Sequence, residues 1–185
     1  MFATLSCHEK EKLTVAEAIQ IIQIRRHDDI QYVLKGNQLV QDVIDRCGRL
    51  PLAMAIIGGL NLKSDDDWQD VIDVIVTPKS ESMAHDYREN LFQTFELSIK
   101  QLNSKHAELF RSLGVFKAVN ISLQSITSLW QVKELEAKPI LKELNSRSLL
   151  TFEDGNRLGV NNTSIIYNVI YVINNIESIQ AVKVN

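Results

Sequence analysis

The stretch Val43–Leu62, VIDRCGRLPLAMAIIGGLNL, constrains the fold more than any other part of the sequence. A charged segment passes through a Gly-Arg-Leu-Pro-Leu elbow directly into a long apolar run. Gly48 can adopt backbone conformations that are forbidden to other residues, and Pro51 can take the first position of a helix, where no amide donor is needed. We therefore expect the elbow to join two helices, with Asp45 and Arg46 on a solvated turn before it.

The apolar run after the elbow fits either a buried strand or a buried helix by periodicity alone, because nearly every position from Leu52 to Leu60 is apolar. Its length and its flanks favour the helix. Gly58 and Gly59 would each cost such a helix about 1 kcal/mol relative to alanine, which is usually tolerated where another backbone comes close or where the helix ends. We expect this helix at the centre of a small core.

The composition is that of a globular protein with one domain or two small ones, since 45% of its 185 residues are hydrophobic and 23% are charged. A formal net charge of −3 gives no electrostatic reason to expect binding to nucleic acid or to an anionic membrane. The two cysteines, Cys7 and Cys47, have no CxxC spacing, so neither a disulfide framework nor a zinc site is predicted. Without a signal-peptide pattern or a bilayer-length apolar run, we expect a cytoplasmic protein.

Two helices are predicted before the elbow. Thr14 and Glu17 have the spacing of a capping box, which predicts a helix from about Thr14 to Arg26. The apolar positions between Gln38 and Cys47 lie on one helical face, and this helix leads into the elbow.

After the central helix, Ser64 is followed by three aspartates and by Trp68. A serine cap with acids in the first turn suits the positive end of a helix dipole. A metal site is the less favoured interpretation, because adjacent helical residues point in different directions. Residues 77–88, TPKSESMAHDYR, combine proline, serine and charge with little apolar pattern, which predicts a linker between two units.

A second periodic region follows the linker and predicts four helices and a hairpin. The helices are expected over Phe92–Leu102, over Ala107–Phe116, from a Ser122 cap to Trp130, and from Pro139, which would open the fourth, to Leu144.

The period then changes from helical to alternating. Residues 149–152 lead to Asp154-Gly155 and return through Leu158 and Val160, which is a strong hairpin signal. Short helices followed by a hairpin form a winged-helix pattern. The tail from Ile165 to Ile179 fits a helix by spacing or a strand by propensity, and we favour a helix.

The order of these elements resembles the C-terminal half of the NB-ARC module of STAND-class nucleotide switches, such as apoptotic-protease-activating factors and plant disease-resistance proteins. The likeness covers roughly Leu13 to Val172. Its most specific part is Cys47–Ala53, CGRLPLA, which matches the family's Cys-Gly-Gly-Leu-Pro-Leu-Ala with Arg49 in place of the second glycine. Trp68 and the stretches LFRSLGVF (109–116) and KELNSRSLL (142–150) support it.

The resemblance implies a mainly α fold, with a helical subdomain followed by a winged-helix subdomain that carries a short β-hairpin wing. The helical, ARC-like subdomain would occupy residues 13–76, with a linker at 77–88. The winged-helix subdomain would occupy residues 89–174, followed by a tail at 175–185.

The resemblance also implies a nucleotide-facing site. The family's motif proline lies against the adenine of ADP or ATP, so Pro51 would do so here, with Leu50 and Leu52 as neighbours; the alternative is that Pro51 only starts a helix. The family's Met-His-Asp, whose histidine reaches the β-phosphate, is matched by residues 160–162, Val-Asn-Asn. Asn161 could donate one hydrogen bond to a phosphate but cannot supply a cation, and we favour a surface turn for it.

The phosphate-binding pattern Gly-x-x-x-x-Gly-Lys-Ser/Thr does not occur in the sequence. Phosphoryl transfer depends on that loop and its magnesium, so we expect no ATP hydrolysis by this chain alone. ADP or ATP binding by the isolated chain is expected to be weak or absent. Met1 falls about where the nucleotide-binding subdomain of a relative would end, so we expect a protein partner, either an intact NB-ARC relative or a missing N-terminal half. A longer or split switch, a truncated paralogue and an incomplete gene model all stay open.

The sequence gives little indication of a metal site, a catalytic triad or a reactive thiol. The four histidines, His8, His27, His85 and His106, stand among polar residues without the spacing of a metal site or a triad, and we expect each at the surface. Cys47 is expected to be a buried structural thiol.

A winged helix raises the alternative of DNA binding through the helix at 139–147, or of a nucleotide-independent adaptor. Glutamates at 134, 136 and 143 offset the lysines of that region, so nucleic acid is not expected as a partner. Regulation of a signalling switch in apoptosis or defence is the favoured function.

Overall fold

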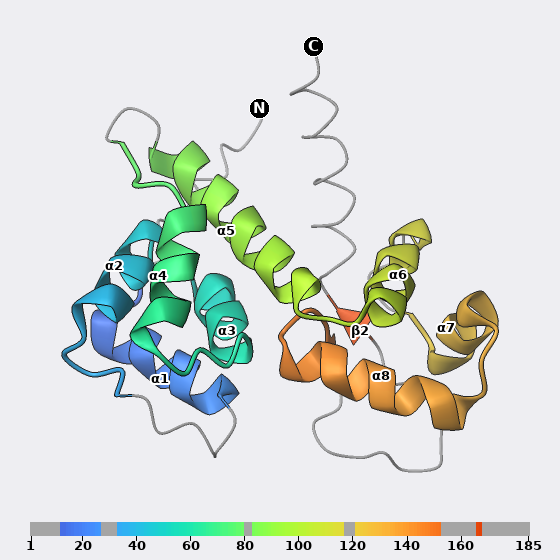
Figure 1. Ribbon diagram of the computed structural model, residues 1–185. Helices are drawn as coiled ribbons and strands as arrows, with labels where there is room; N and C mark the ends of the chain where they lie inside the picture. The colour runs from blue at the N-terminus through green and yellow to red at the C-terminus, as the bar shows by residue number, and fades with distance from the viewer. Residues whose placement is uncertain (1–11, 27–32, 80–82, 117–120, 153–165, 168–185) are drawn as a thin grey trace, which may run out of the picture.

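The computed structural model describes residues 12–26, 33–79, 83–116, 121–152 and 166–167. Within these ranges the chain is mainly helical, as predicted. Figure 1 shows α1 to α4 gathered on one side and α6 to α8 on the other, with the long helix α5 running between the two groups. None of the helices in these ranges is both long and apolar enough to cross a bilayer.

The first group contains the four helices that the sequence predicts around the elbow. They are α1 (Val15–Arg25), α2 (Gln38–Arg46), α3 (Pro51–Gly59) and α4 (Asp65–Val74). The capping boxes of Thr14 with Glu17 and of Ser64 with Asp67 are both present, which confirms the predicted starts of α1 and α4. The core of this group includes Ile22, Val43, Ile44, Met54, Ile57 and Trp68.

One detail before the elbow was predicted wrongly. Asp45 and Arg46 belong to the last turn of α2, and Arg46 is half-buried. Its guanidinium donates hydrogen bonds to the carbonyl oxygens of Ile72 and Ile75, each at 3.2 Å. These carbonyls lie at the end of α4, where the last turn of any helix leaves carbonyl groups without intrahelical donors, so Arg46 caps α4 instead of facing solvent.

The helix between the two groups, α5 (Met83–Lys100), starts inside the predicted linker. The second group contains α6 (Ser104–Ser112), the 3₁₀ turn η1 (Leu113–Val115), α7 (Leu123–Trp130) and α8 (Glu134–Ser146). Ser122 caps α7, as predicted. The core of this group includes Phe95, Phe110, Ile126, Leu144, Leu149 and Leu150.

Pro139 does not open the last helix of this group, contrary to the prediction. Helix α8 begins at Glu134 and contains Pro139 in its interior. Glu134 and Glu136 in the first turn suit the positive end of the helix dipole. Pro139 is exposed, so water can reach the backbone carbonyl that the missing proline donor leaves free.

Two short strands follow α8. Strand β1 (Thr151–Phe152) pairs antiparallel with β2 (Ile166–Tyr167), with Thr151 opposite Tyr167. The predicted turn at Asp154-Gly155 and the return through Val160 lie outside the described residues, so the winged-helix hairpin stays a prediction. A strand at 166–167 differs from the helix favoured for the tail and agrees instead with the β propensity of isoleucine and tyrosine.

Helix α3 connects the two groups. Ile57 packs into the first core, whereas its neighbour Ile56 packs into the second. A Cβ atom on Gly59 would lie 2.8 Å from the Cα of Arg147, and a Cβ on Gly58 would lie 2.7 Å from the carbonyl oxygen of Ile22. Of the two explanations that the sequence left open for these glycines, close approach of another backbone holds for both, and Gly59 is also the last residue of α3. Next to Arg147, the hydroxyl of Ser148 donates a 3.0 Å hydrogen bond to the backbone carbonyl of Ala55 in α3.

Candidate functional site

The elbow between α2 and α3 is a compact turn with two successive left-handed residues. Gly48 has a φ of 64° and Arg49 a φ of 56°. The amide of Gly48 donates to the carbonyl of Asp45 at 3.0 Å, and the amide of Arg49 donates to the carbonyl of Ile44 at 3.1 Å. This geometry satisfies the end of α2 and turns the chain so that Pro51 enters α3 at its first position.

Gly48 is fixed by a side chain of α5. A Cβ atom added to Gly48 would lie 2.7 Å from Cγ of the Tyr87 ring and 2.8 Å from two other ring atoms. No real Cβ atom sits so close to another carbon, so only glycine fits between the turn and the ring. Gly48 is therefore needed for two reasons. Its backbone takes a left-handed conformation, as the sequence predicts, and the Tyr87 ring lies too close to it for any side chain.

Arg49 takes the left-handed conformation at the position where the family motif has its second glycine. A residue with a Cβ pays about 1–2 kcal/mol for this backbone conformation. Its guanidinium pairs with the carboxylate of Asp45, with Nη2 2.8 Å and Nε 2.9 Å from Oδ1. Both side chains are exposed to solvent, so this ion pair stabilises the turn by less than the left-handed backbone costs.

Cys47 is a buried structural thiol, as predicted. It is fully buried within the first core and has no disulfide partner. Burial raises the pKa of its thiol from an ordinary 9.0 to about 12, because a thiolate would lose its hydration there. Since the thiolate is the reactive form, Cys47 is not a nucleophile at neutral pH.

The residues predicted to face a nucleotide lie at the surface of the elbow. Pro51 is exposed, Leu52 is 39% exposed, and Leu50 is half-buried against the first core. No side chain caps the N-terminus of α3. The elbow thus offers an apolar edge beside a helix N-terminus, where a ring and a negative charge can both be received. Asn161, the other predicted contact, lies outside the described residues.

The sequence analysis missed Asn90, which holds the elbow region together from α5. Its side chain is fully buried and makes three hydrogen bonds of 2.8 Å. The amide group donates to the carbonyls of Arg46 and Val76, and its oxygen accepts from the Val76 amide. A polar residue at a buried position of a helix is the signal that could have identified it, since such a group must find partners.

One of the four histidines was assigned wrongly to the open surface. Nδ1 of His106 lies 2.6 Å from Oε2 of Glu143 across α6 and α8, and only 24% of the His106 side chain is exposed. His85 is exposed, as predicted, at 76%. His8 and His27 lie outside the described residues.

The three aspartates lie in the first turn of α4, and Asp67 completes a capping box with Ser64, in agreement with the favoured interpretation. Oδ2 of Asp67 accepts from the amides of Lys63 at 2.7 Å and Ser64 at 2.9 Å. The amide of Lys63 is the main reason that the pKa of Asp67 is lowered, since it stabilises the carboxylate. Within the described ranges, no group of three or more metal-binding side chains is present.

Comparisons with known proteins confirm the predicted resemblance. The chain is 28% identical over 127 residues to disease resistance protein ADR1 of Arabidopsis thaliana and 28% identical over 122 residues to apoptotic protease-activating factor 1 of Danio rerio. A probable disease resistance protein of Arabidopsis thaliana is 24% identical over 130 residues.

These matches cover 65%, 63% and 67% of the chain but only 16%, 10% and 16% of the three relatives. No family model matches the chain. The matches are consistent with an NB-ARC-related fragment.

Proposed function

We propose that this chain is a regulatory part of an NB-ARC-type signalling switch, and that its elbow contributes one wall of an ADP-binding pocket. The premise is its similarity to plant resistance proteins and to an apoptotic protease-activating factor. The observation that carries the proposal is the exposed Pro51–Leu52 edge at the uncapped N-terminus of α3, presented on a rigid turn.

The elbow suits a wall of a pocket because it is fixed in place before any ligand arrives. Tyr87 holds Gly48, and Asn90 holds the end of α2. A pre-organised contact loses little conformational entropy on binding. The apolar surface of Pro51 and Leu52 would contact the adenine, and Leu50 would anchor this edge by packing against the first core.

The chain by itself would regulate and would not catalyse. It has no phosphate-binding loop, so a partner that carries this loop would supply the remaining walls of the pocket. A closed arrangement with ADP and an open arrangement without it would form the two states that the nucleotide biases. The compartment of this activity would be the cytoplasm, and the protein partner an NB-ARC relative or a separate N-terminal half.

Calorimetric titration of ADP into the chain tests the proposal. We expect weak, saturable binding with a Kd of roughly 1 mM, because most of the pocket is absent. Pro51→Ala should weaken it about fivefold, the effect of losing about 1 kcal/mol of apolar contact. Pro139→Ala is the matched control, since it removes another exposed proline from the second group.

Two results would count against ADP binding by the elbow of the isolated chain. One is the absence of any binding heat at millimolar ADP, and the other is binding that Pro51→Ala leaves unchanged. Either would favour a nucleotide-independent adaptor, whose partner could be recovered without added nucleotide.

A further inference from the structure

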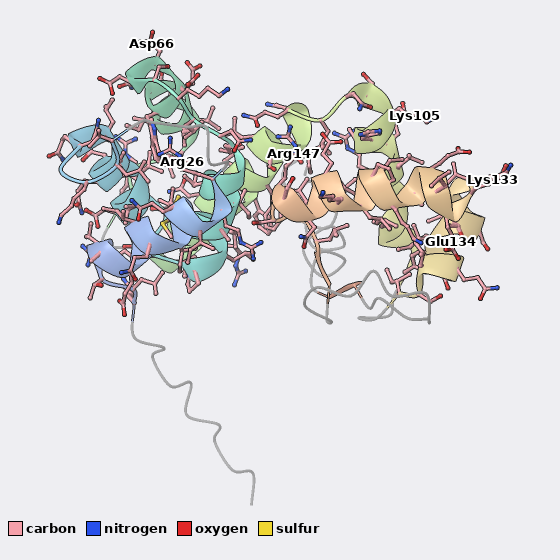
Figure 2. The ribbon with its side chains drawn as sticks, turned by 90° about the horizontal axis from the view of Figure 1, so that it is seen from below. Arg26, Asp66, Lys105, Lys133, Glu134 and Arg147 are labelled. Carbon is pink, nitrogen blue, oxygen red and sulfur yellow. The ribbon has the colours of Figure 1, made fainter. Side chains whose placement is uncertain are left out.

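We draw no further inference here: the strongest candidate, the side-chain cluster beside the end of α8 where Figure 2 shows Arg147, carries no site, because Glu143 holds both His106 and Arg147, Arg147 also binds Gln101, and no third metal-ligating side chain joins His106 and Glu143 within the described residues.

Discussion

Gly48 in the elbow and Tyr87 in α5 lie in direct contact, with no room between them for even one methyl group. The contact joins the exposed elbow to the helix that leads into the second group. The position of the elbow is therefore set by α5 as well as by its own turn.

Replacing Gly48 with alanine should destabilise the protein by about 2–5 kcal/mol. The left-handed backbone costs about 1–2 kcal/mol and the collision with the ring adds about 1–3 kcal/mol. Gly36→Ala is the matched control, since Gly36 has a φ of 77° but no atom within 4 Å of a new Cβ. Urea unfolding of both variants measures the difference in unfolding free energy. Equal losses of unfolding free energy would show that the contact with the Tyr87 ring does not limit the substitution.

Replacing Arg49 with glycine should stabilise the protein by about 0.5–1 kcal/mol. The substitution relieves a left-handed backbone, which outweighs the added entropy of the unfolded chain and the loss of an exposed ion pair. Arg49→Ala keeps the strained backbone while losing the same ion pair, so it should give no gain. Thermal unfolding of the two variants side by side tests this, and a stability gain in the alanine variant would contradict it.

Asn90→Ala should destabilise the protein by about 2–4 kcal/mol. It removes three 2.8 Å hydrogen bonds, so that the carbonyls of Arg46 and Val76 lose this donor and the Val76 amide loses this acceptor. Gln93→Ala, one turn further along α5, loses only a hydrogen bond to Glu89 and should cost less than 1 kcal/mol. Chemical denaturation compares the pair; a loss for Asn90→Ala no larger than for Gln93→Ala would argue against this role.

The stability of the protein should decrease with pH in the alkaline range because of Cys47. Burial raises the pKa of its thiol to about 12 in the folded state, whereas the unfolded thiol ionises near 9.0. Between these values the unfolded state has released a proton that the folded state still holds, so the contribution of Cys47 is lost at about 1.4 kcal/mol per pH unit.

The difference in unfolding free energy between the protein and Cys47→Ala isolates this effect, since all other groups titrate in both proteins. That difference should be constant below pH 9 and shrink above it. A difference that stays constant up to pH 11 would show that the thiol is not protected by the fold.

The sequence was most informative where structure depends on neighbouring residues. The capping box at Thr14, the serine cap at Ser64 and the helix start at Pro51 follow from residues three positions apart or fewer, and all three are present. A close backbone approach at Gly58 and Gly59 was one of two explanations that the helical interpretation offered, although the sequence could not name Ile22 and Arg147 as their neighbours.

The parts that were missed depend on contacts between distant residues. Asn90 and Arg46 are 44 positions apart, and no local pattern connects them. The start of α8 was placed at Pro139 because proline favours a first turn, but burial of Ala137 and Ile140 in the second core extends the helix to Glu134. His106 was assigned to the surface because its sequence neighbours are polar. Its partner Glu143 lies on another helix and could not be identified from those neighbours.

The division of α3 between two cores has a consequence for how the chain folds. Ile56 and Ile57 are adjacent, yet each completes a different set of buried side chains. Neither set can be fully packed until α3 has formed, and loss of this one helix opens both. Unfolding should therefore be a single cooperative transition, and a cut between α4 and α5 would leave two pieces that are each less stable than the intact chain.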